Sequence, residues 1–113
     1  MAVDAEMVDG AREATAFLKA LANEHRLLIL CHLLESECTV SDLEKALDLR
    51  QPTLSQQLAR LRGDNLVDTR RDGKNIYYSL ADDSVAHTLE LLFKLFCSDE
   101  AKAARRRAIP LAS

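Results

Sequence analysis

The chain has 113 residues, which is enough for one domain and leaves no room for a separate catalytic domain. Its composition, 48% hydrophobic and 29% charged, allows it to fold around a core, and we predict a single domain over residues 1–113, ordered at about 8–104. The acidic N-terminus, MAVDAEMVDG, lacks the basic and apolar regions of a signal peptide, and no apolar run reaches the ~18 residues that span a bilayer. We therefore expect a cytoplasmic protein.

Charge is distributed unevenly along the chain. The formal net charge is −3, but residues 50–74 hold six basic and three acidic side chains, so this window is +3 and the other 88 residues carry −6. A basic face on an acidic body is typical of a DNA-binding protein. From charge alone, a solvated surface without a partner is an equally good interpretation.

Two amphipathic helices are predicted near the N-terminus. Residues 8–22 carry apolar side chains at the spacing of one helix face, and the predicted inward positions are Ala11, Ala14, Leu18 and Leu21. Asn23 is a candidate N-cap for a second helix at about 24–35, because its side-chain oxygen can accept from a first-turn N–H group. The inward positions predicted for this second helix are Leu27, Leu30, Cys31 and Leu34.

Two further helices are predicted in the middle of the chain, joined by a short turn. The first starts at Thr39 or Ser41, where Ser41 and Glu44 have the spacing of a capping box. The second covers about 52–63, with Pro52 at its first position, where a missing N–H group is tolerated. The inward positions predicted for the two helices are Val40, Leu43, Leu47, Leu54, Leu58 and Leu61.

A β-hairpin and a last helix are predicted to complete the domain. The runs Leu66–Arg71 and Asn75–Leu80 are rich in strand-forming residues, and Asp72-Gly73 between them is a strong turn signal. The last helix starts near Asp82, and a flexible basic tail is expected beyond about residue 105. The main apolar stripe of that helix consists of Val85, Leu89, Leu92, Phe93 and Phe96.

The predicted order of elements is that of a winged helix-turn-helix domain: mainly α, in the order α-α-α-α-β-β-α, with a β-hairpin wing. The last helix also has Leu91 and Leu95 off its main stripe. A helix that is apolar on more than one side needs a second partner surface, so we expect a homodimer in which the first and last helices form the interface.

The fourth helix is the candidate recognition helix, because its polar side chains have the chemistry to approach DNA. Hydroxyl and amide groups suit base edges and phosphates, and glutamine can pair bidentately with adenine. The hairpin adds basic side chains near a tight tip, as in a wing that follows phosphates or enters the minor groove. The candidate DNA-binding residues are Gln51, Thr53, Ser55, Gln56, Arg60, Arg70, Arg71 and Lys74. A protein-interaction module that never contacts DNA is the alternative for the same order of elements.

A long stretch of the chain resembles the ArsR-type repressors. It comprises LKALANEHRLLILCHLL followed by TVSDLEKALDLRQPTLSQQLARLRGDNLVDTRRDGKNIYYSL, and the likeness covers about residues 15–98. The segment QPTLSQQLARLRGDNLV is similar to the family's recognition helix apart from Pro52, where a small polar residue is more usual. The resemblance implies a homodimer built from the first and last helices, which binds a partly palindromic double-stranded operator and is released by an inducer.

Metal sensing, which is common in that family, needs ligands that this chain lacks at the matching positions. The family's two-cysteine site at the third helix corresponds to Thr39 and Ser41, although Cys38 lies one residue upstream. The family's other site keeps Asp82, but its remaining places are occupied by Ser84, Leu95 and Ser98. We therefore expect no metal site and no cofactor, and a metal-sensing repressor is the lesser alternative.

The cysteines are the better candidates for a sensor. Cys31 lies on the second helix and Cys97 at the edge of the last, and burial as unreactive hydrophobic residues is the common fate of such thiols. The segments ILCHLL and LFKLFC, with cysteines 66 residues apart, resemble the thiol-based, persulfide-sensing subgroup of ArsR-type repressors. That resemblance implies that Cys31 and Cys97 form the sensor pair. Cys38 has no counterpart there and is interpreted as an accessory loop thiol open to oxidation.

The sequence as a whole predicts a DNA-binding transcriptional repressor that releases its operator when sulfane sulfur, from a persulfide or polysulfide, links Cys31 to Cys97. A direct disulfide needs the two Cα atoms within about 7 Å. A repressor that senses peroxide or another thiol oxidant is the alternative for the same residues. No nucleophile–base pair and no phosphate-binding loop is evident in the sequence, so an enzyme is not expected.

Overall fold

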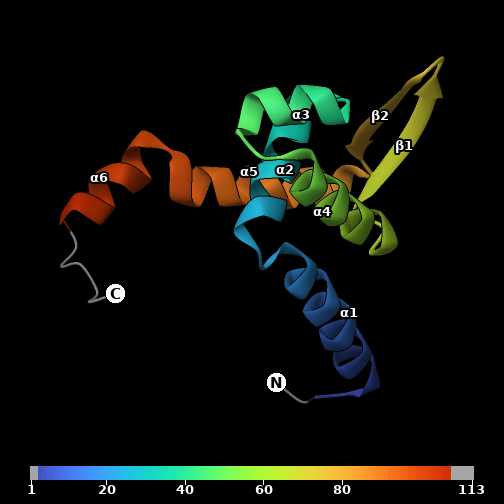
Figure 1. Ribbon diagram of the computed structural model, residues 1–113. Coiled ribbons are helices and arrows are strands. Elements are labelled where there is room, and N and C mark those ends of the chain that lie inside the picture. The colour runs from blue at the N-terminus through green and yellow to red at the C-terminus, as the bar shows by residue number, and fades with distance from the viewer. Residues whose placement is uncertain (1–2, 108–113) are drawn as a thin grey trace.

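The computed structural model describes residues 3–107, which form helices and one β-hairpin (Figure 1). In chain order the elements are α1 (Ala5–Leu21), α2 (Glu24–Glu35), α3 (Val40–Leu47), α4 (Gln51–Gly63), β1 (Val67–Asp72), β2 (Asn75–Leu80), α5 (Asp83–Cys97) and α6 (Asp99–Arg107). The predicted winged helix-turn-helix architecture, mainly α with a β-hairpin wing, is confirmed. None of the helices within residues 3–107 combines the length and apolar character needed to cross a membrane.

Side-chain caps explain where α2 and α3 begin. The Asn23 side chain accepts a hydrogen bond from the backbone N–H of Arg26 at 3.1 Å, as predicted. At α3 the capping box is formed by Thr39 and Asp42, whose side chains each accept from the other's backbone N–H at 3.1 and 3.0 Å. The predicted box of Ser41 and Glu44 is wrong, because α3 begins at Val40 and Ser41 is already inside the helix.

The two strands pair antiparallel, with Val67 opposite Leu80 and Asp72 opposite Asn75. The turn is therefore Gly73-Lys74, one residue later than predicted, since β1 extends through Asp72. Gly73 has φ 64, a left-handed conformation that glycine adopts without steric cost.

The base of the hairpin is joined to the segment that precedes α3. Cys38 and Tyr78 exchange backbone hydrogen bonds, with N···O distances of 3.0 and 2.8 Å. The loop between α2 and α3 thus acts as a short third strand beside β2. These bonds hold the wing against the helix-turn-helix.

The hydrophobic core lies between α2, α3, α4 and the N-terminal half of α5. Its fully buried members include Leu43, Leu54, Leu58, Leu61 and Leu89, as predicted. The predicted inward face of α2 is partly wrong. That helix buries Arg26, Ile29, Leu30 and Leu33, whereas Leu27, Cys31 and Leu34 are only partly buried. The run LLILCHLL is apolar on nearly every side, so periodicity does not define which face turns inward.

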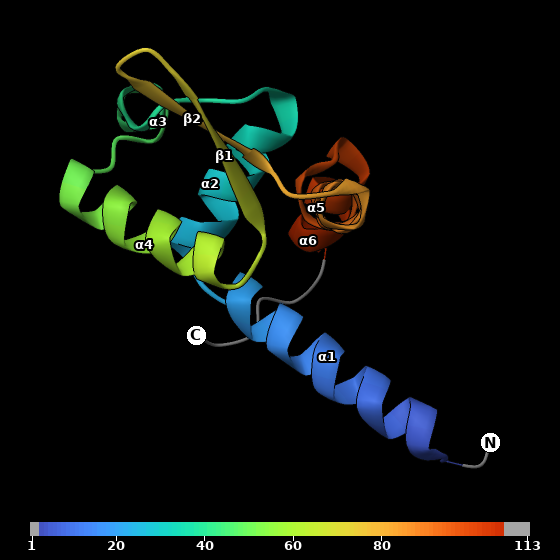
Figure 2. The same ribbon diagram turned by 90° about the vertical axis from the view of Figure 1, so that its right-hand side faces the viewer.

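Helix α1 projects away from the rest of the chain, as both views show (Figures 1 and 2). Only its C-terminal end is buried, at Ala20 and Leu21. The prediction that Ala11, Ala14 and Leu18 point into the core of this chain is wrong, because all three are exposed and Leu18 is 60% exposed. The apolar face that the sequence shows is present, but no part of the described chain covers it.

The C-terminal half of α5 is similarly open. Val85 and Leu89 are buried as predicted, whereas Phe93 and Phe96 are each 55% exposed. Ser98 adopts an extended conformation that ends α5, and a further helix, α6, follows. The predicted order of elements had no separate helix after α5, although alanine, lysine and arginine at 101–107 favour one. The tail beyond 107 lies outside the described residues.

Candidate functional sites: a DNA-binding face and a dithiol pocket

Helices α3 and α4 form the helix-turn-helix, and their packing determines which face of α4 is free. Leu54, Leu58 and Leu61 are each 0% exposed and bind α4 to the core. Asp48, at φ 53, ends α3 in a left-handed conformation and turns the chain toward α4. The opposite face of α4 presents the predicted recognition residues Gln51, Ser55, Gln56 and Arg60 as exposed side chains, with Thr53 half-buried.

Arg60 is on this face but is already paired. Its Nε donates at 2.8 Å to the carboxylate of Asp64, the residue that caps the C-terminal end of α4. A surface pair at this spacing is weak, about 0.3–0.5 kcal/mol, so a phosphate can replace the carboxylate at little cost.

The three basic residues predicted in the wing are not equivalent. Arg71 and Lys74 are exposed near the hairpin tip. Arg70 instead donates from Nε to both carboxylate oxygens of Glu37, at 2.9 and 3.1 Å, and also from Nη2 to Oε1. Its guanidinium lies 4.4 Å from the centre of the Tyr77 ring. The hydrogen bond from Arg70 lowers the pKa of Glu37, which therefore stays ionised and keeps the arginine engaged.

Two polar residues behind the recognition helix were missed by the sequence analysis. Arg26 is only 8% exposed, and its Nη1 donates to Oε1 of Gln57 on α4 at 3.0 Å. Arg26, Ile29, Leu30 and Leu33 have the spacing of one helix face, but the apolar residues on nearly every side of α2 left that face unidentified in the sequence. That series places a charged group on the inner face, where it needs polar partners.

The predicted sensor cysteines meet at one pocket. Cys31 of α2 and Cys97, the last residue of α5, both line a hollow of about 330 Å³ between these helices. The other lining residues are Glu24, Leu27, Leu28, Leu92, Phe93 and Phe96. Both thiols are free, Cys31 half-buried and Cys97 exposed.

The surroundings of Cys31 suppress its ionisation. Burial raises the pKa of the Cys31 thiol, and a negative charge on the nearby Cys97 would raise it further. This effect of Cys97 on Cys31 agrees with the position of both residues at one pocket. Since the thiolate is the nucleophile, exposed Cys97 is the more accessible attacking group.

Cys38 is not a loop thiol open to oxidation, and that interpretation was wrong. The residue is 4% exposed in the core, its backbone is paired with Tyr78, and its Sγ donates to the Ser36 carbonyl at 3.4 Å. Burial raises its pKa as well. The side chain of Cys38 turns inward because its backbone pairs with that of Tyr78. This pairing joins residues far apart in the sequence, so residues near Cys38 gave no sign of it.

Across residues 3–107, no three side chains of His, Cys, Asp or Glu gather where they could hold a metal ion.

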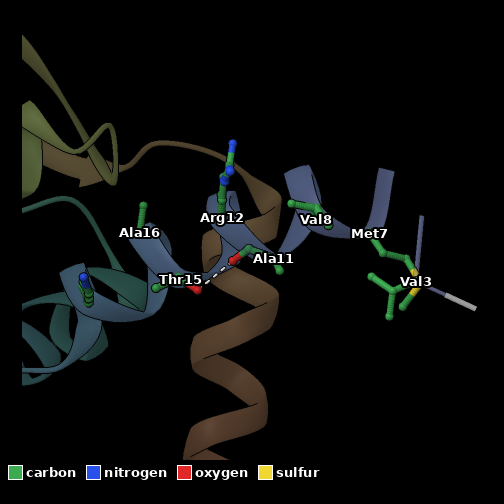
Figure 3. A pocket seen from close by; sticks show the side chains of 8 residues that line it. Val3, Met7, Val8, Ala11, Arg12, Thr15 and Ala16 are labelled. Carbon is green, nitrogen blue, oxygen red and sulfur yellow. Dashed lines mark hydrogen bonds between the residues drawn. The ribbon is translucent and has the colours of Figure 1, made fainter. Parts of the chain in front are cut away.

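A long apolar hollow runs along the exposed α1. Its volume is about 650 Å³, and Figure 3 shows apolar side chains at successive turns of the helix. The lining residues are Val3, Met7, Val8, Ala11, Arg12, Thr15, Ala16 and Lys19. On α5, Leu91 and Leu95 are 55% and 53% exposed. The helices predicted to form a dimer interface are thus the ones that expose apolar surface in a single chain.

A helix-turn-helix with an exposed polar recognition face and an adjoining β-hairpin defines a winged helix-turn-helix protein of the DNA-binding class. The family model described as bacterial regulatory protein, arsR family, matches residues 23–69, which span α2 to the first residues of β1. The chain belongs to the ArsR family of transcriptional regulators.

Individual relatives cover most of the chain. It is 49% identical to the biofilm growth-associated repressor of Agrobacterium fabrum over 80% of this chain and 77% of that protein. It is 46% identical to the transcriptional activator HlyU of Vibrio cholerae over 81% of this chain and 85% of that protein. The structure of reduced HlyU from the same species superposes with a TM-score of 0.78 at 45% identity, covering 82% of this chain and 98% of that one.

A winged helix-turn-helix domain from Mycobacterium bovis, described as homodimeric, superposes with a TM-score of 0.71 at 30% identity, over 88% of this chain and 97% of that one. Because the relatives include a named repressor and a named activator, what they share is regulation of transcription.

Proposed function

We propose that this protein is a homodimeric repressor that binds operator DNA when its thiols are reduced and releases it when sulfane sulfur links Cys31 to Cys97. The observation that carries the proposal is the shared pocket. Two cysteines 66 residues apart in the sequence line the same hollow of about 330 Å³. The named relatives regulate transcription, and one is a repressor.

The pocket favours a two-step exchange. The Cys97 thiolate attacks the sulfane sulfur of a persulfide RSSH, so that a Cys97 persulfide forms and RS⁻ leaves. The Cys31 thiolate then attacks the inner sulfur, which forms the Cys31–Cys97 disulfide and expels HS⁻. In total, two thiols and RSSH become one disulfide, RSH and hydrogen sulfide, so the persulfide is the oxidant. A donor that leaves two sulfur atoms on Cys97 gives a trisulfide by the same displacement of HS⁻.

A bridge between Cys31 and Cys97 can change the arrangement of the DNA-binding helices. Helix α2 carries Cys31 and packs against α3 and α4 as well as α5. A bridge between α2 and α5 therefore favours one arrangement of the helix-turn-helix relative to α5. A coupling free energy of about 1–3 kcal/mol is enough to lower operator affinity by about 5- to 150-fold.

The dimer rests on the uncovered apolar surfaces of α1 and α5. Leu18 on α1 and Leu91 and Leu95 on α5 are each more than half exposed. A second subunit would cover them and place two recognition helices about 34 Å apart, the distance of one turn of DNA. On each helix, Gln56 and its exposed neighbours face the major groove, and Arg71 and Lys74 of the wing contact the backbone.

The experiment compares thiol state with DNA release. Reduced protein is bound to its own upstream DNA and treated in parallel with glutathione persulfide, hydrogen peroxide and glutathione disulfide. Binding is followed by gel shift, and the cysteine products are identified by mass spectrometry. We expect persulfide to release the DNA and to produce a Cys31–Cys97 bridge within one subunit. Release of the DNA by peroxide and not by persulfide would contradict persulfide sensing and support a peroxide sensor instead.

Single cysteine variants provide the matched controls. Cys31→Ser and Cys97→Ser should each abolish release by persulfide, while Cys38→Ser, at the buried thiol, should still release. Normal release by Cys31→Ser would contradict the proposed switch. A reduced protein that fails to bind DNA would contradict the repressor and support an interaction module.

A further inference from the structure

One buried arginine joins three helices. Arg26 lies in the first turn of α2 and is 8% exposed. Its Nε donates to the Ala20 carbonyl at 2.6 Å, its Nη2 to the Lys19 carbonyl at 3.2 Å, and its Nη1 to Oε1 of Gln57 at 3.0 Å. All three acceptors are neutral oxygens. Burying a guanidinium is costly, so this geometry holds it in place through directed hydrogen bonds rather than a carboxylate.

The first two bonds fix the end of α1. The carbonyls of the last turn of a helix have no partner inside the helix, and the macrodipole makes that end negative. Arg26 supplies donors and a positive charge to the carbonyls of Ala20 and Lys19, the second of which also accepts from the backbone N–H of Ala22 at 3.2 Å. The direction in which α1 leaves the body of the protein is therefore tied to the guanidinium of Arg26.

The third bond fixes α4. Gln57 is half-buried, whereas its neighbour Gln56 is exposed on the recognition face. The amide of Gln57 therefore faces Arg26, behind the helix, and not the DNA. Through one planar group, the end of α1 is joined to the middle of the recognition helix. Because the guanidinium is planar and its donors point in fixed directions, it holds the angle between α1 and α4 better than one hydrogen bond from a flexible side chain would.

We propose that Arg26 and Gln57 are positioning residues that set the distance between the two recognition helices, and so the operator half-site spacing that the dimer accepts. The inference rests on the proposed dimer, in which α1 is part of the interface. The angle between α1 and α4 then determines where each recognition helix meets the duplex. One inserted base pair moves a half-site by about 3.4 Å and rotates it by about 34°. A dimer whose recognition helices are rigidly connected should therefore bind the altered duplex much more weakly.

The experiment measures a ratio of affinities within each variant. Duplexes are selected from a randomised pool by the unaltered protein, and one base pair is then added or removed at their centre. Fluorescence anisotropy gives Kd for the selected and altered spacings. We expect the unaltered protein to prefer the selected spacing at least tenfold. In Gln57→Met, which keeps the length and helix propensity but removes the acceptor, we expect this preference to fall to about threefold or less.

Two further variants keep the test decisive. Gln57→Glu retains an acceptor for Arg26 and should restore the preference for the selected spacing. Gln57→Ala, which also lacks the acceptor, is used in place of Gln57→Met if the methionine variant is poorly folded. A purely structural role would weaken binding to every duplex alike and leave the ratio unchanged, which would overturn the proposal. An unaltered protein without spacing preference would overturn it too. Sedimentation of the same samples separates these outcomes from failure of the dimer itself, because a monomer contradicts the proposed function.

Discussion

Helices α4 and α5 both carry an apolar stripe, but only the stripe of α4 is buried along its whole length. On α4, Leu54, Leu58 and Leu61 are each 0% exposed, whereas on α5 Phe93 and Phe96 are each 55% exposed. The helix-turn-helix is thus complete within one chain. Helix α1 and the C-terminal half of α5 leave apolar surface uncovered, and the dithiol pocket opens between that half of α5 and α2. In the proposed function, the buried stripe holds the recognition helix in place, while the open surface is left for a second subunit and for the reaction of the thiols.

The largest effect that tests this contrast is on stability. Leu58→Ala removes a fully buried side chain from α4 and should lower the free energy of unfolding by about 2–5 kcal/mol. Leu95→Ala, at a residue that is 53% exposed on α5, should cost less. Its cost should depend on protein concentration, because in the proposed dimer the second subunit covers Leu95. Urea unfolding at two protein concentrations measures both. If both variants lost the same free energy of unfolding at both protein concentrations, the proposed difference between a buried α4 and a partly open α5 would be contradicted.

The next effect concerns the exposed face of α4. Gln56→Ala should weaken operator binding by about 1–3 kcal/mol if the amide makes a bidentate contact with a base. Because the side chain is exposed, the unfolding transition should hardly change. Titration of the operator, with a scrambled duplex as control, measures the loss. Equal weakening on both duplexes would assign Gln56 to the phosphate backbone rather than to base reading.

The sensor half should respond to pH. Burial raises the pKa of Cys31 above the ordinary thiol value of about 8.5, so near neutral pH most of it is protonated. Its thiolate fraction rises about tenfold per pH unit below that pKa. If attack by Cys31 limits bridging, the rate should therefore increase from about pH 6 to about pH 8, and Cys38→Ser should show the same profile. Stopped-flow bridging rates that do not vary with pH would assign the slow step elsewhere.

The smallest effects distinguish two neighbouring arginines of the wing. Arg71→Ala should reduce the slope of log affinity against log salt by about one phosphate contact. Arg70→Ala should leave that slope nearly unchanged, since Glu37 and Tyr77 already hold its guanidinium. Glu37→Gln is the matched variant that frees Arg70, and it should steepen the slope. Equal slopes for Arg70→Ala and Arg71→Ala would show that the Glu37 pair opens on DNA.

Local sequence patterns were sufficient for most of the fold and for the outer face of the site. The cap at Asn23, the leucine stripe of α4 and the hairpin depend on residues within a few positions of each other, and they were predicted. The likeness of Cys31 and Cys97 to a known thiol pair also came from sequence. Their placement at one pocket agrees with that prediction, while their reactivity stays a prediction.

Tertiary packing decided the features that depend on which side of a helix or loop turns inward. The run LLILCHLL is apolar all round, so only the packed structure shows that Arg26 faces inward and reaches Gln57. The pairing of Arg70 with Glu37 and the burial of Cys38 each join segments more than 30 residues apart. Periodicity describes one helix or strand at a time, and long-range hydrogen bonds are formed only after those elements meet. The sequence alone therefore determined the class of protein and the exposed polar residues of its recognition helix, and the tertiary structure determined how those residues are held and connected.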